Sequence, residues 1–211
     1  MNLSLLDWRR TVAASYADVR AAADPEAAWQ RWITVRDGLF AHHPDTPIEN
    51  VAQFAGLHYA PYDASLCFVA PVIAAPPARL DMKTSDGVVP LTRIGAAQLP
   101  FGSLDVWWVS LYGGGVFVPF ADATNGLSTY GGGRYQIDTI KGADLGGDLT
   151  TGTLRLDFNF AYHPSCYYNS RWSCPLAPAG NRLPVRIDAG EVTGPGKLTS
   201  PALAQSPSRA P

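Results

Sequence analysis

The sequence is poor in charge, and neither sign predominates. Of its 211 residues, 16 are lysine or arginine and 18 are aspartate or glutamate. Charged residues make up 16% of the chain, against about 25% in an ordinary globular protein. Because nucleic-acid binding depends on a basic surface that neutralises phosphates, this composition argues against a nucleic-acid partner.

Long apolar runs and a signal-peptide pattern are also missing. The sequence has no uninterrupted stretch of about 18 apolar residues, the length that indicates a membrane-spanning helix. Near the start, Asp7, Arg9 and Arg10 come too early for the hydrophobic region of a signal peptide. We therefore expect a cytoplasmic protein without a membrane partner.

Cysteine is scarce, with Cys67, Cys166 and Cys174 only, which argues against a disulfide scaffold in a reducing compartment. His163 with Cys166 and Cys174 supplies three metal-ligand types, but the paired C-x2-C spacing of zinc sites and a fourth ligand are lacking. A nucleophilic pair of His163 with a thiol is a second interpretation. We favour inert thiols beside aromatic residues, and we expect no metal and no cofactor.

Lysine and glutamate, which favour exposed helices, occur three times each. In contrast, 20 glycines and 18 prolines are dispersed along the chain. They divide it into short segments typical of a turn-rich β fold. The first forty residues are the exception. Apolar residues spaced by three and four predict a helix from Ser4 to Ala22, and Asp24 with Pro25 begins a second.

After residue 56 the pattern changes to short segments of β-branched and aromatic residues. We expect about eight strands: Leu57–Ala60, Leu66–Ile73, Leu80–Lys83, Val88–Arg93, Ser103–Tyr112, Val116–Phe120, Arg134–Thr139 and Thr153–Ala161. Glycine turns between them indicate hairpins and antiparallel pairing. The sequence thus predicts one α+β domain over residues 1–191. Helices in about residues 4–55 pack on an antiparallel β-barrel or β-roll in about 56–191, and residues 192–211 form a flexible tail.

Polar residues of the types that bind ligands or transfer protons are concentrated between residues 122 and 191. Arg134 follows three glycines and presents a fork suited to a carboxylate, unless the glycines simply form a turn. In the alternating segment from Leu154 to Ala161, Asp157 and Asn159 share the polar face. That face either meets solvent or lines a cavity. Trp107 and Trp108 point to opposite faces of their strand, so one belongs to the core and the other is free to line a pocket.

Several separate motifs together resemble the bacterial domain-of-unknown-function family 1684. They are Asp122-x-Thr124-x-Gly126, Thr129 to Tyr135, Leu156-Asp157-Phe158-Asn159-x-Ala161-Tyr162-x-Pro164-x-Cys166, Cys174-Pro175-Leu176-x-Pro178, Asn181 to Val185 and Ala189 to Glu191. Arg36-Asp37-x-x-Phe40 and Phe54-x-Gly56-Leu57-x-Tyr59 resemble the amino-terminal half of that family. The similarity covers about residues 25 to 191.

The resemblance implies no activity, because the family is named for its lack of one, but it draws attention to particular polar positions. The motif positions are Tyr130, Arg134, Asp157, Asn159, Cys166, Cys174, Asn181, Arg182 and Glu191. Two positions depart from the family pattern. His163 stands where the family usually carries Asn, and Gly180 stands where an acid commonly precedes the Asn-Arg-Leu run.

Our first functional hypothesis is a cofactor-independent enzyme, of biosynthetic type, acting on a small, partly apolar metabolite with a carboxylate or carbonyl. The reaction would be a lyase, cyclisation or hydrolysis step. Arg134 would anchor the oxygen, Tyr130 or Asp157 would handle a proton, Asn159 would join them, and His163 would be a specialised acid or base. The remaining candidates for substrate binding or a hydrogen-bond network are Trp107, Cys166, Asn181, Arg182 and Glu191.

Two alternatives differ in class. The first is a non-catalytic module in which a buried network of Asp157, Asn181, Arg182 and Glu191 holds the carboxy-terminal loop on the sheet. The second is a flavin- or haem-binding β-barrel, for which the sequence shows no motif. The expected partner is a small-molecule ligand, and a homodimer is compatible with the sequence.

Overall fold

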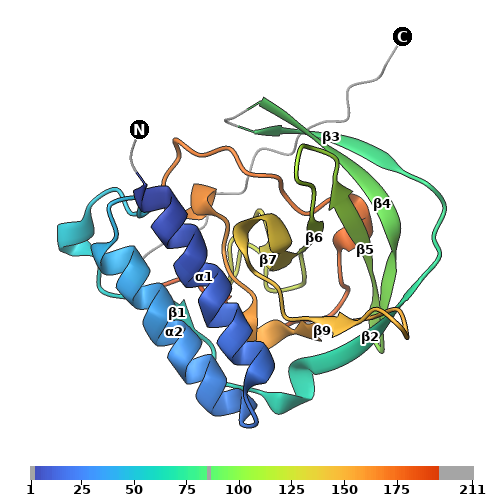
Figure 1. Ribbon diagram of the computed structural model, residues 1–211, viewed down its shortest axis with the longest axis horizontal. Coiled ribbons are helices and arrows are strands. Elements are labelled where there is room, and N and C mark those ends of the chain that lie inside the picture. Colours follow the sequence, from blue (N-terminus) through green and yellow to red (C-terminus); the bar gives the residue numbers. More distant parts are fainter. Residues whose placement is uncertain (1–2, 85–86, 195–211) are drawn as a thin grey trace.

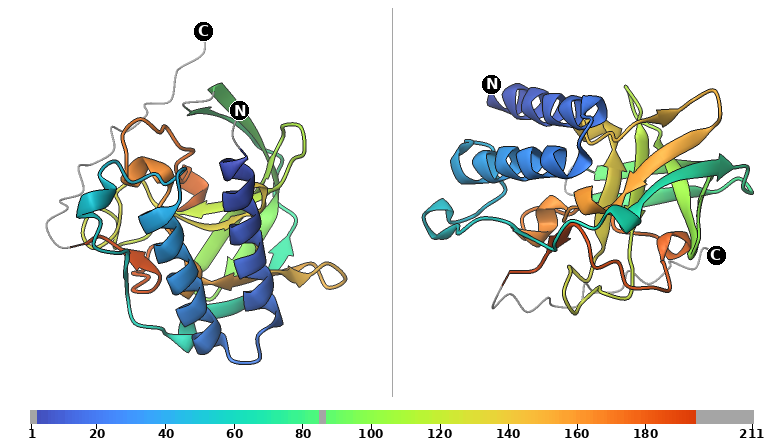
Figure 2. Two further views of the ribbon diagram at one scale, coloured as in Figure 1. Left: turned by 60° about the vertical axis from the view of Figure 1, so that its left-hand side comes forward. Right: turned by 90° about the horizontal axis from the view of Figure 1, so that it is seen from below.

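The computed structural model describes residues 3–84 and 87–194 of the chain. Two helices, α1 (Ser4–Ala21) and α2 (Pro25–His42), run side by side against one side of a curled sheet (Figures 1 and 2). Asp24 caps α2 by accepting a hydrogen bond from the backbone N–H of Ala27 at 3.0 Å. The two-helix prediction is confirmed.

Antiparallel strands make up the rest of the fold. They are β1 (His58–Tyr59), β2 (Cys67–Ile73), β3 (Arg79–Thr84), β4 (Gly87–Leu99), β5 (Gly102–Val109), β6 (Val116–Phe120), β7 (Arg134–Asp138), β8 (Gly147–Asp148), β9 (Thr153–Asp157) and β10 (Glu191–Val192). The main sheet has the order β7-β6-β5-β4-β2-β9-β8, β3 also pairs with β4, and β1 pairs with β10. Short 3-10 helices occur at Val51–Gln53, Ala64–Leu66, Thr139–Lys141, Phe158–Phe160, Ser165–Tyr167 and Ala179–Asn181.

The sheet curls strongly and forms a half-barrel, visible around β6 in Figure 1. Its two ends approach each other through a bridge between Tyr135 and Tyr162 and a hydrogen bond from Gln136 Nε2 to the carbonyl of Asp157 at 2.8 Å. The expected α+β class with helices packed on an antiparallel sheet is confirmed. The sheet predicted as a barrel or roll is a half-barrel in the structure.

Two strands differ most from their predicted extents, for local reasons. β4 continues to Leu99 through a bulge between Arg93 and Gly95, where a side chain on Gly95 would collide with the backbone of Ile73. The strand expected over Thr153–Ala161 ends at Asp157, because the Asp157 carboxylate caps the turn at Phe158–Phe160. The alternating pattern therefore does not continue as strand beyond residue 157.

Two hydrophobic clusters form the core. One joins the helix pair to the sheet and is rich in aromatic residues, among them Tyr16, Trp29, Trp32, Trp107, Tyr135 and Phe160. The other fills the curl of the half-barrel and includes Val118, Phe120, Leu156 and Phe158, covered by Leu183 and Ile187. Of the tryptophan pair, Trp107 is buried, whereas Trp108 is 42% exposed. This agrees with the expectation that only one belongs to the core.

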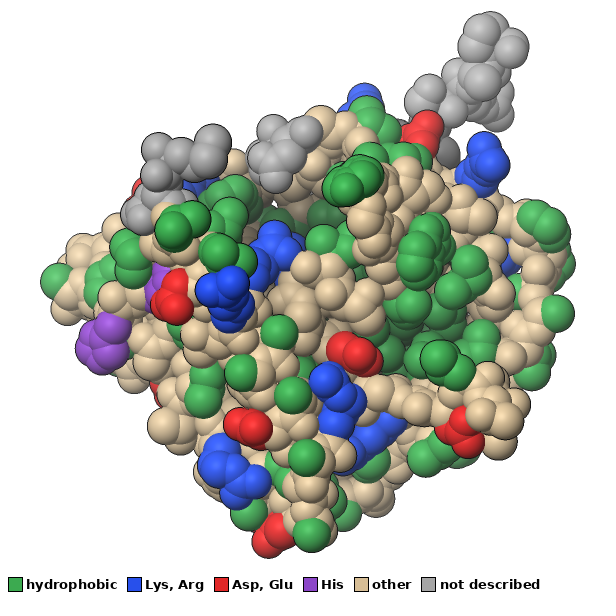
Figure 3. Space-filling view, in the orientation of Figure 1, with side chains coloured by type: hydrophobic (Ala, Val, Ile, Leu, Met, Phe, Trp, Pro, Cys, Tyr) green, Lys and Arg blue, Asp and Glu red, His purple; other side chains and the backbone are tan. Residues whose placement is uncertain are grey.

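The outer surface carries hydrophobic side chains over the strands and scattered charges of both signs (Figure 3). None of the described helices is long and apolar enough to cross a membrane. Val192 belongs to β10, and the backbone N–H of Thr193 bonds to the carbonyl of Ser128 at 2.9 Å. The flexible tail expected from residue 192 lies, from residue 195 onward, outside the described residues.

Candidate functional site

Arg134 is buried at the start of β7 and anchors the carboxy-terminal segment. Its Nη2 donates to Asp122 Oδ2 at 2.6 Å and to the carbonyl of Ile187 at 2.9 Å, and its Nη1 donates to the carbonyls of Ala189 and Glu191. Burial lowers the pKa of Arg134, and the charge of Asp122 opposes that effect. Both terminal nitrogens are used in these contacts, Nε is buried without a hydrogen-bond partner, and Arg134 lines neither of the two cavities described below.

Asp157 and Asn159 form a second buried group at the end of β9. Asp157 pairs with Arg155 at 3.1 Å and accepts hydrogen bonds from the backbone and side chain of Asn159. Asn159 also binds both backbone polar groups of Asp63, at 2.8 Å each. These residues tie the turn after β9 to the segment before β2. Asp157 and Asn159 are fully buried and line neither of the two cavities described below, whereas Arg155 is partly exposed.

Asn181 joins the carboxy-terminal segment to the sheet. Its side chain accepts from Trp107 Nε1 at 3.0 Å and donates to the carbonyls of Asp105 and Pro119 at 2.9 and 2.8 Å. Arg182, next in the chain, is exposed. The expected network of Asp157, Asn181, Arg182 and Glu191 is therefore not one continuous group.

Glu191 lies in a different polar cluster, which centres on Arg36 of α2. Arg36 Nη2 donates to Glu191 Oε2 at 2.9 Å, and Arg36 Nε donates to the hydroxyl of Tyr59 at 2.9 Å. The Glu191 carboxylate also accepts from the backbone N–H of His163 at 2.9 Å and from the hydroxyl of Tyr168. The guanidinium packs on the rings of Trp32, Phe40 and Tyr162, with centroid distances of 4.9 to 5.2 Å.

The protonation states of this cluster follow from burial and charge. Burial opposes ionisation of Glu191, yet the neighbouring His163 and Arg36 lower its pKa to about 2. Burial lowers the pKa of His163, with Glu191 opposing it. Since the Tyr130 backbone N–H donates to His163 Nε2 at 3.2 Å, the proton of the neutral imidazole sits on Nδ1. That N–H lies 3.5 Å from Glu191 Oε1 without forming a hydrogen bond.

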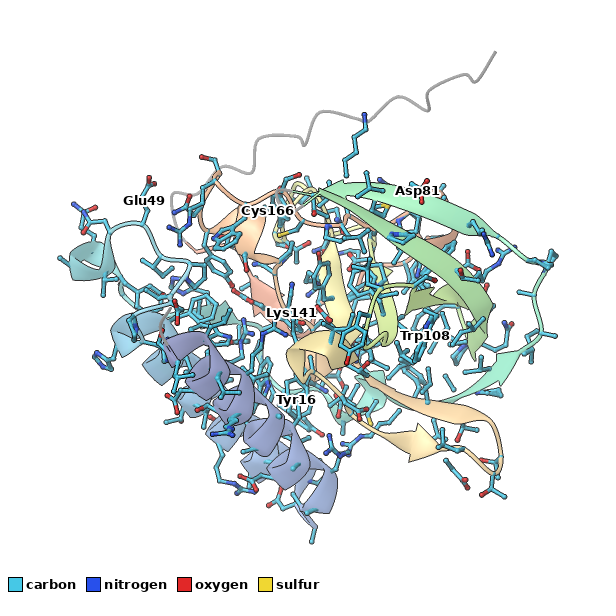
Figure 4. All side chains as sticks on the ribbon, turned by 45° about the horizontal axis from the view of Figure 1, so that its top comes forward. Tyr16, Glu49, Asp81, Trp108, Lys141 and Cys166 are labelled. Carbon is cyan, nitrogen blue, oxygen red and sulfur yellow. The ribbon has the colours of Figure 1, made fainter. Side chains whose placement is uncertain are left out.

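An aromatic cavity of about 80 Å³ lies at the seam between the helix pair and the half-barrel. Its walls come from α1, α2, the 3-10 turn Thr139–Lys141 and the segment after β9. The lining residues with rings are Trp8, Tyr16, Trp32, Phe40, Tyr135, Tyr162, His163 and Tyr168. Arg36 and Lys141 also line it. Figure 4 shows Tyr16 on α1 and Lys141 at this seam.

Three donors among the lining residues make no hydrogen bond within the described part of the protein, although Glu191 Oε1 lies 3.5 Å from one of them, His163 Nδ1. The hydroxyl of Tyr16 and Nδ1 of His163 are buried without a hydrogen-bond partner. Arg36 Nη1 makes no hydrogen bond to a described residue, whereas the other two nitrogens of the guanidinium do. Burial raises the pKa of Tyr16, which keeps its hydroxyl protonated. The cavity therefore presents donors and requires an acceptor.

A second hollow, of about 320 Å³, lies on the other side of Tyr168. It is lined mainly by residues 48–58 together with Tyr167, Glu191 and Gly194. Tyr168 lines both spaces and donates its hydroxyl to Glu191, which lines the second. The segment after β9 is thus the wall shared by the two spaces.

Of the five residues expected to be catalytic, only His163 lines the aromatic cavity. Tyr130 lies behind it, donating its backbone N–H to His163, with its hydroxyl 3.8 Å from Cys166 Sγ. Neither ring nitrogen of His163 hydrogen-bonds a thiol, and no group of three metal-ligating side chains is found among the described residues. The structure thus separates Arg134 and Asp157 from the cavity and leaves the expected set in three places.

Sequence reasoning missed Tyr16, Arg36 and Tyr168 as site residues. Tyr16 is one of the apolar positions that predict the first helix, and its position gives no sign that its hydroxyl is unpartnered. Arg36 offered a clearer signal, because it stands between Trp32 and Phe40 at spacings of four on one helix face. A charge in the middle of an aromatic face indicates either a paired or a functional residue.

The chain belongs to the family described as a protein of unknown function (DUF1684), whose model matches residues 52–192. It is similar to the uncharacterised protein from gene locus rrnAC0354 of Haloarcula marismortui, whose structure was determined in solution by NMR. The two share 33% sequence identity and a TM-score of 0.55, over 80% of this chain and 94% of the other. No curated protein matches the chain significantly.

Proposed function

We propose that the protein binds a small, partly apolar molecule through a carbonyl or carboxylate oxygen in the aromatic cavity. The observation that carries this proposal is the convergence on one cavity of three donor groups: the Tyr16 hydroxyl, which has no hydrogen-bond partner, Arg36 Nη1, and His163 Nδ1, which lies 3.5 Å from Glu191 Oε1 without bonding to it. A buried donor left unsatisfied costs about 1–3 kcal/mol. An acceptor oxygen at this place satisfies donors that the fold itself leaves open.

The remaining walls suit the apolar part of such a ligand. Rings from Trp8, Trp32 and Phe40 supply flat hydrophobic surface, as is typical of small-molecule sites. The volume of about 80 Å³ favours a short chain or a small head group over a flavin or haem, since pockets for drug-sized ligands occupy about 300–1,000 Å³. The favoured ligand is therefore a small metabolite.

Converging donors also provide a route to catalysis, because they stabilise negative charge that develops on a bound oxygen. In that extension of the proposal, the protein polarises a carbonyl in a cofactor-independent lyase, cyclisation or hydrolysis reaction. His163 would act as a donor, since its Nε2 already accepts the Tyr130 backbone N–H. Arg134 and Asp157 would position the surrounding chain without touching the ligand.

The test uses two probes that share a four-carbon chain and differ in the head group. Butyrate offers only acceptors at neutral pH, and butylamine offers only donors. The side-chain indole signals of the six tryptophans can be followed by NMR as each probe is added. We expect butyrate to shift the signals of Trp8 and Trp32, which line the cavity, in a saturable way. Signals of Trp107 and Trp172 should remain unchanged, and butylamine should have no effect.

Two variants make the test specific to the donors. Tyr16→Phe removes one hydroxyl and should weaken butyrate binding about fivefold, the effect of one hydrogen bond of about 1 kcal/mol. Tyr112→Phe is the matched control, because Tyr112 is fully exposed on the loop after β5. Equal shifts from both probes, or no saturable shift at Trp8 and Trp32, would contradict the proposal. In the latter case ordered water is the better occupant for the donors.

A further inference from the structure

Two of the three cysteines lie together on the segment that walls the aromatic cavity. Cys166 belongs to the 3-10 turn Ser165–Tyr167, and its backbone N–H donates to Cys174 Sγ at 3.4 Å. The Cys166 thiol donates in turn to the hydroxyl of Tyr130, at 3.8 Å between sulfur and oxygen. Both cysteines are partly exposed and reduced. Figure 4 shows Cys166 on this segment, above the helix pair.

The contacts make the two sulfur atoms chemically different. Cys174 Sγ accepts a hydrogen bond from the Cys166 backbone N–H, and the charge of Lys141 favours its thiolate form. The Cys166 thiol instead donates its proton to the Tyr130 hydroxyl. Hydrogen bonding with Cys166 is the main cause that lowers the pKa of Cys174 to about 6, against the effect of burial. The same pair interaction raises the pKa of Cys166. These contacts favour the thiolate form of Cys174 and the protonated thiol of Cys166.

The charge that favours the Cys174 thiolate is that of Lys141, whose ammonium also lies 3.4 Å from Asp138 Oδ2. Cys166 and the hydroxyls of Tyr130 and Tyr135 also interact with Cys174, and the pKa values of the two tyrosines are raised mainly by burial. Tyr135 donates to the carbonyl of Pro175 at 2.6 Å, which fixes the backbone next to Cys174. The backbone around the Cys174 sulfur is therefore fixed by hydrogen bonds, and the charge of Lys141 favours its thiolate.

Cys67 is a natural comparison within the same molecule. It lies on β2 opposite Asp157 and is also partly exposed. Burial raises its pKa, as does the charge of Asp157. The three thiols therefore have similar exposure but differ in the charges and hydrogen bonds that act on them.

We propose that Cys174 and Cys166 form a peroxide-reactive dithiol site, in which Cys174 is the nucleophile and Cys166 the resolving thiol. The Cys174 thiolate attacks one oxygen of hydrogen peroxide, the O–O bond breaks, and the products are a sulfenic acid and hydroxide, which takes a proton to become water. The Cys166 thiol then attacks that sulfur, forming the disulfide and releasing the second water. The peroxide is reduced: the two sulfur atoms supply the two electrons, the Cys166 thiol supplies one proton, and the solvent supplies the other.

Oxidation at this site acts on the wall of both cavities. The disulfide closes a ring of chain that contains Tyr167 and Tyr168, and Tyr168 lines both spaces and donates to Glu191. His163 and Pro164, just before the ring, line the aromatic cavity. The redox state of the pair would therefore set how freely this wall moves.

The sequence allows a direct test, because trypsin cleaves after Arg171, between the two cysteines. The full-length reduced protein is treated with one equivalent of hydrogen peroxide, and free thiols are blocked before digestion. We expect the peptides 156–171 and 172–182 to appear linked by a disulfide, and to separate after dithiothreitol. The absence of the linked pair, or a main linkage through Cys67, would overturn the proposal.

Rates and variants identify the nucleophile. In the untreated protein, iodoacetamide should label Cys174 with a pH midpoint near 6, whereas Cys67 should require a pH above that of an ordinary thiol. Cys166→Ser should leave Cys174 as a sulfenic acid that dimedone traps, and Cys67→Ser should leave the linkage intact. Labelling of Cys174 no faster than Cys67 at neutral pH would refute the assignment, even if a disulfide forms under excess oxidant.

Discussion

Replacing Arg134 by methionine should destabilise the fold strongly and leave the aromatic cavity in place. Methionine keeps most of the length of the side chain but removes the charge and every donor. It leaves the buried Asp122 carboxylate without its cation, and it removes the donor to the carbonyls of Ile187, Ala189 and Glu191. The substitution therefore removes contacts to the segment that contains β10.

The magnitude follows from the burial of the pair. The Arg134 and Asp122 side chains are both 0% exposed, and their charged atoms are 2.6 Å apart. Removing one partner of such a pair typically costs about 3–5 kcal/mol, because an uncompensated charge remains buried. In a protein of this length, about 1 kcal/mol lowers the melting temperature by roughly 2–4 °C. The expected decrease is thus about 10 °C.

Urea unfolding followed by tryptophan fluorescence measures this loss. Arg182→Met is the matched control, since that arginine is exposed, and its effect should stay within about 0.5 kcal/mol. Adding Asp122→Asn to Arg134→Met should recover part of the loss. The amide removes the buried charge yet keeps an oxygen for the backbone N–H of Thr124. A loss below about 1 kcal/mol in the single variant would refute the view that this pair anchors the carboxy-terminal segment.

Two further predictions concern acid stability and the glycine turn. Because the neighbouring His163 and Arg36 outweigh burial and lower the pKa of Glu191 from 4.5 to about 2, its stabilising effect is present above pH 4.5 and disappears as the pH falls towards 2. Glu191→Gln should flatten that part of the melting-temperature profile, and an unchanged slope would contradict the assignment. Gly133→Ala should lower the melting temperature more than Gly126→Ala. Both glycines have positive φ, but a Cβ on Gly133 would lie 2.5 Å from the carbonyl oxygen of Phe120, whereas Gly126 faces open space. Equal effects would show that the contact is irrelevant.

The helices and most strands follow from local signals. Asp24 and Pro25 begin α2 as expected, and the segment Val116–Phe120 is a strand over the predicted residues. Such elements are specified by residues next to one another in the chain, which a pattern can detect. The end of β9 shows where that fails. The alternation continues past Asp157, but a side-chain hydrogen bond to the backbone of Asn159 turns the chain.

The candidate site depends on contacts that sequence spacing does not encode. Arg36 and Glu191 are 155 positions apart and pair at 2.9 Å. Arg134 stands in a glycine-rich motif that equally suits an anion-binding loop, and only its four backbone and carboxylate acceptors show that its two terminal nitrogens are used within the fold, while Nε is buried without a partner. Polar residues near one another in sequence were therefore expected to share a site, whereas the fold distributes them over separate groups.

The Arg36–Glu191 pair is difficult to explain by stability alone. A buried ion pair loses hydration, and replacing it by apolar side chains is often neutral or stabilising. Here the surroundings already supply Trp32, Phe40 and Tyr162, against which a hydrophobic side chain would pack. The pair instead keeps a cation at the cavity wall, with Nη1 left for an acceptor. An occupant that bridges α1, α2 and the segment after β9 would stabilise the folded state by about 2.7 kcal/mol at one hundred times its dissociation constant. Because it binds the seam between the helix pair and the half-barrel, that stabilisation would strengthen the docking of the helices. Under the proposed function, the buried charge of Arg36 contributes to ligand binding rather than to packing.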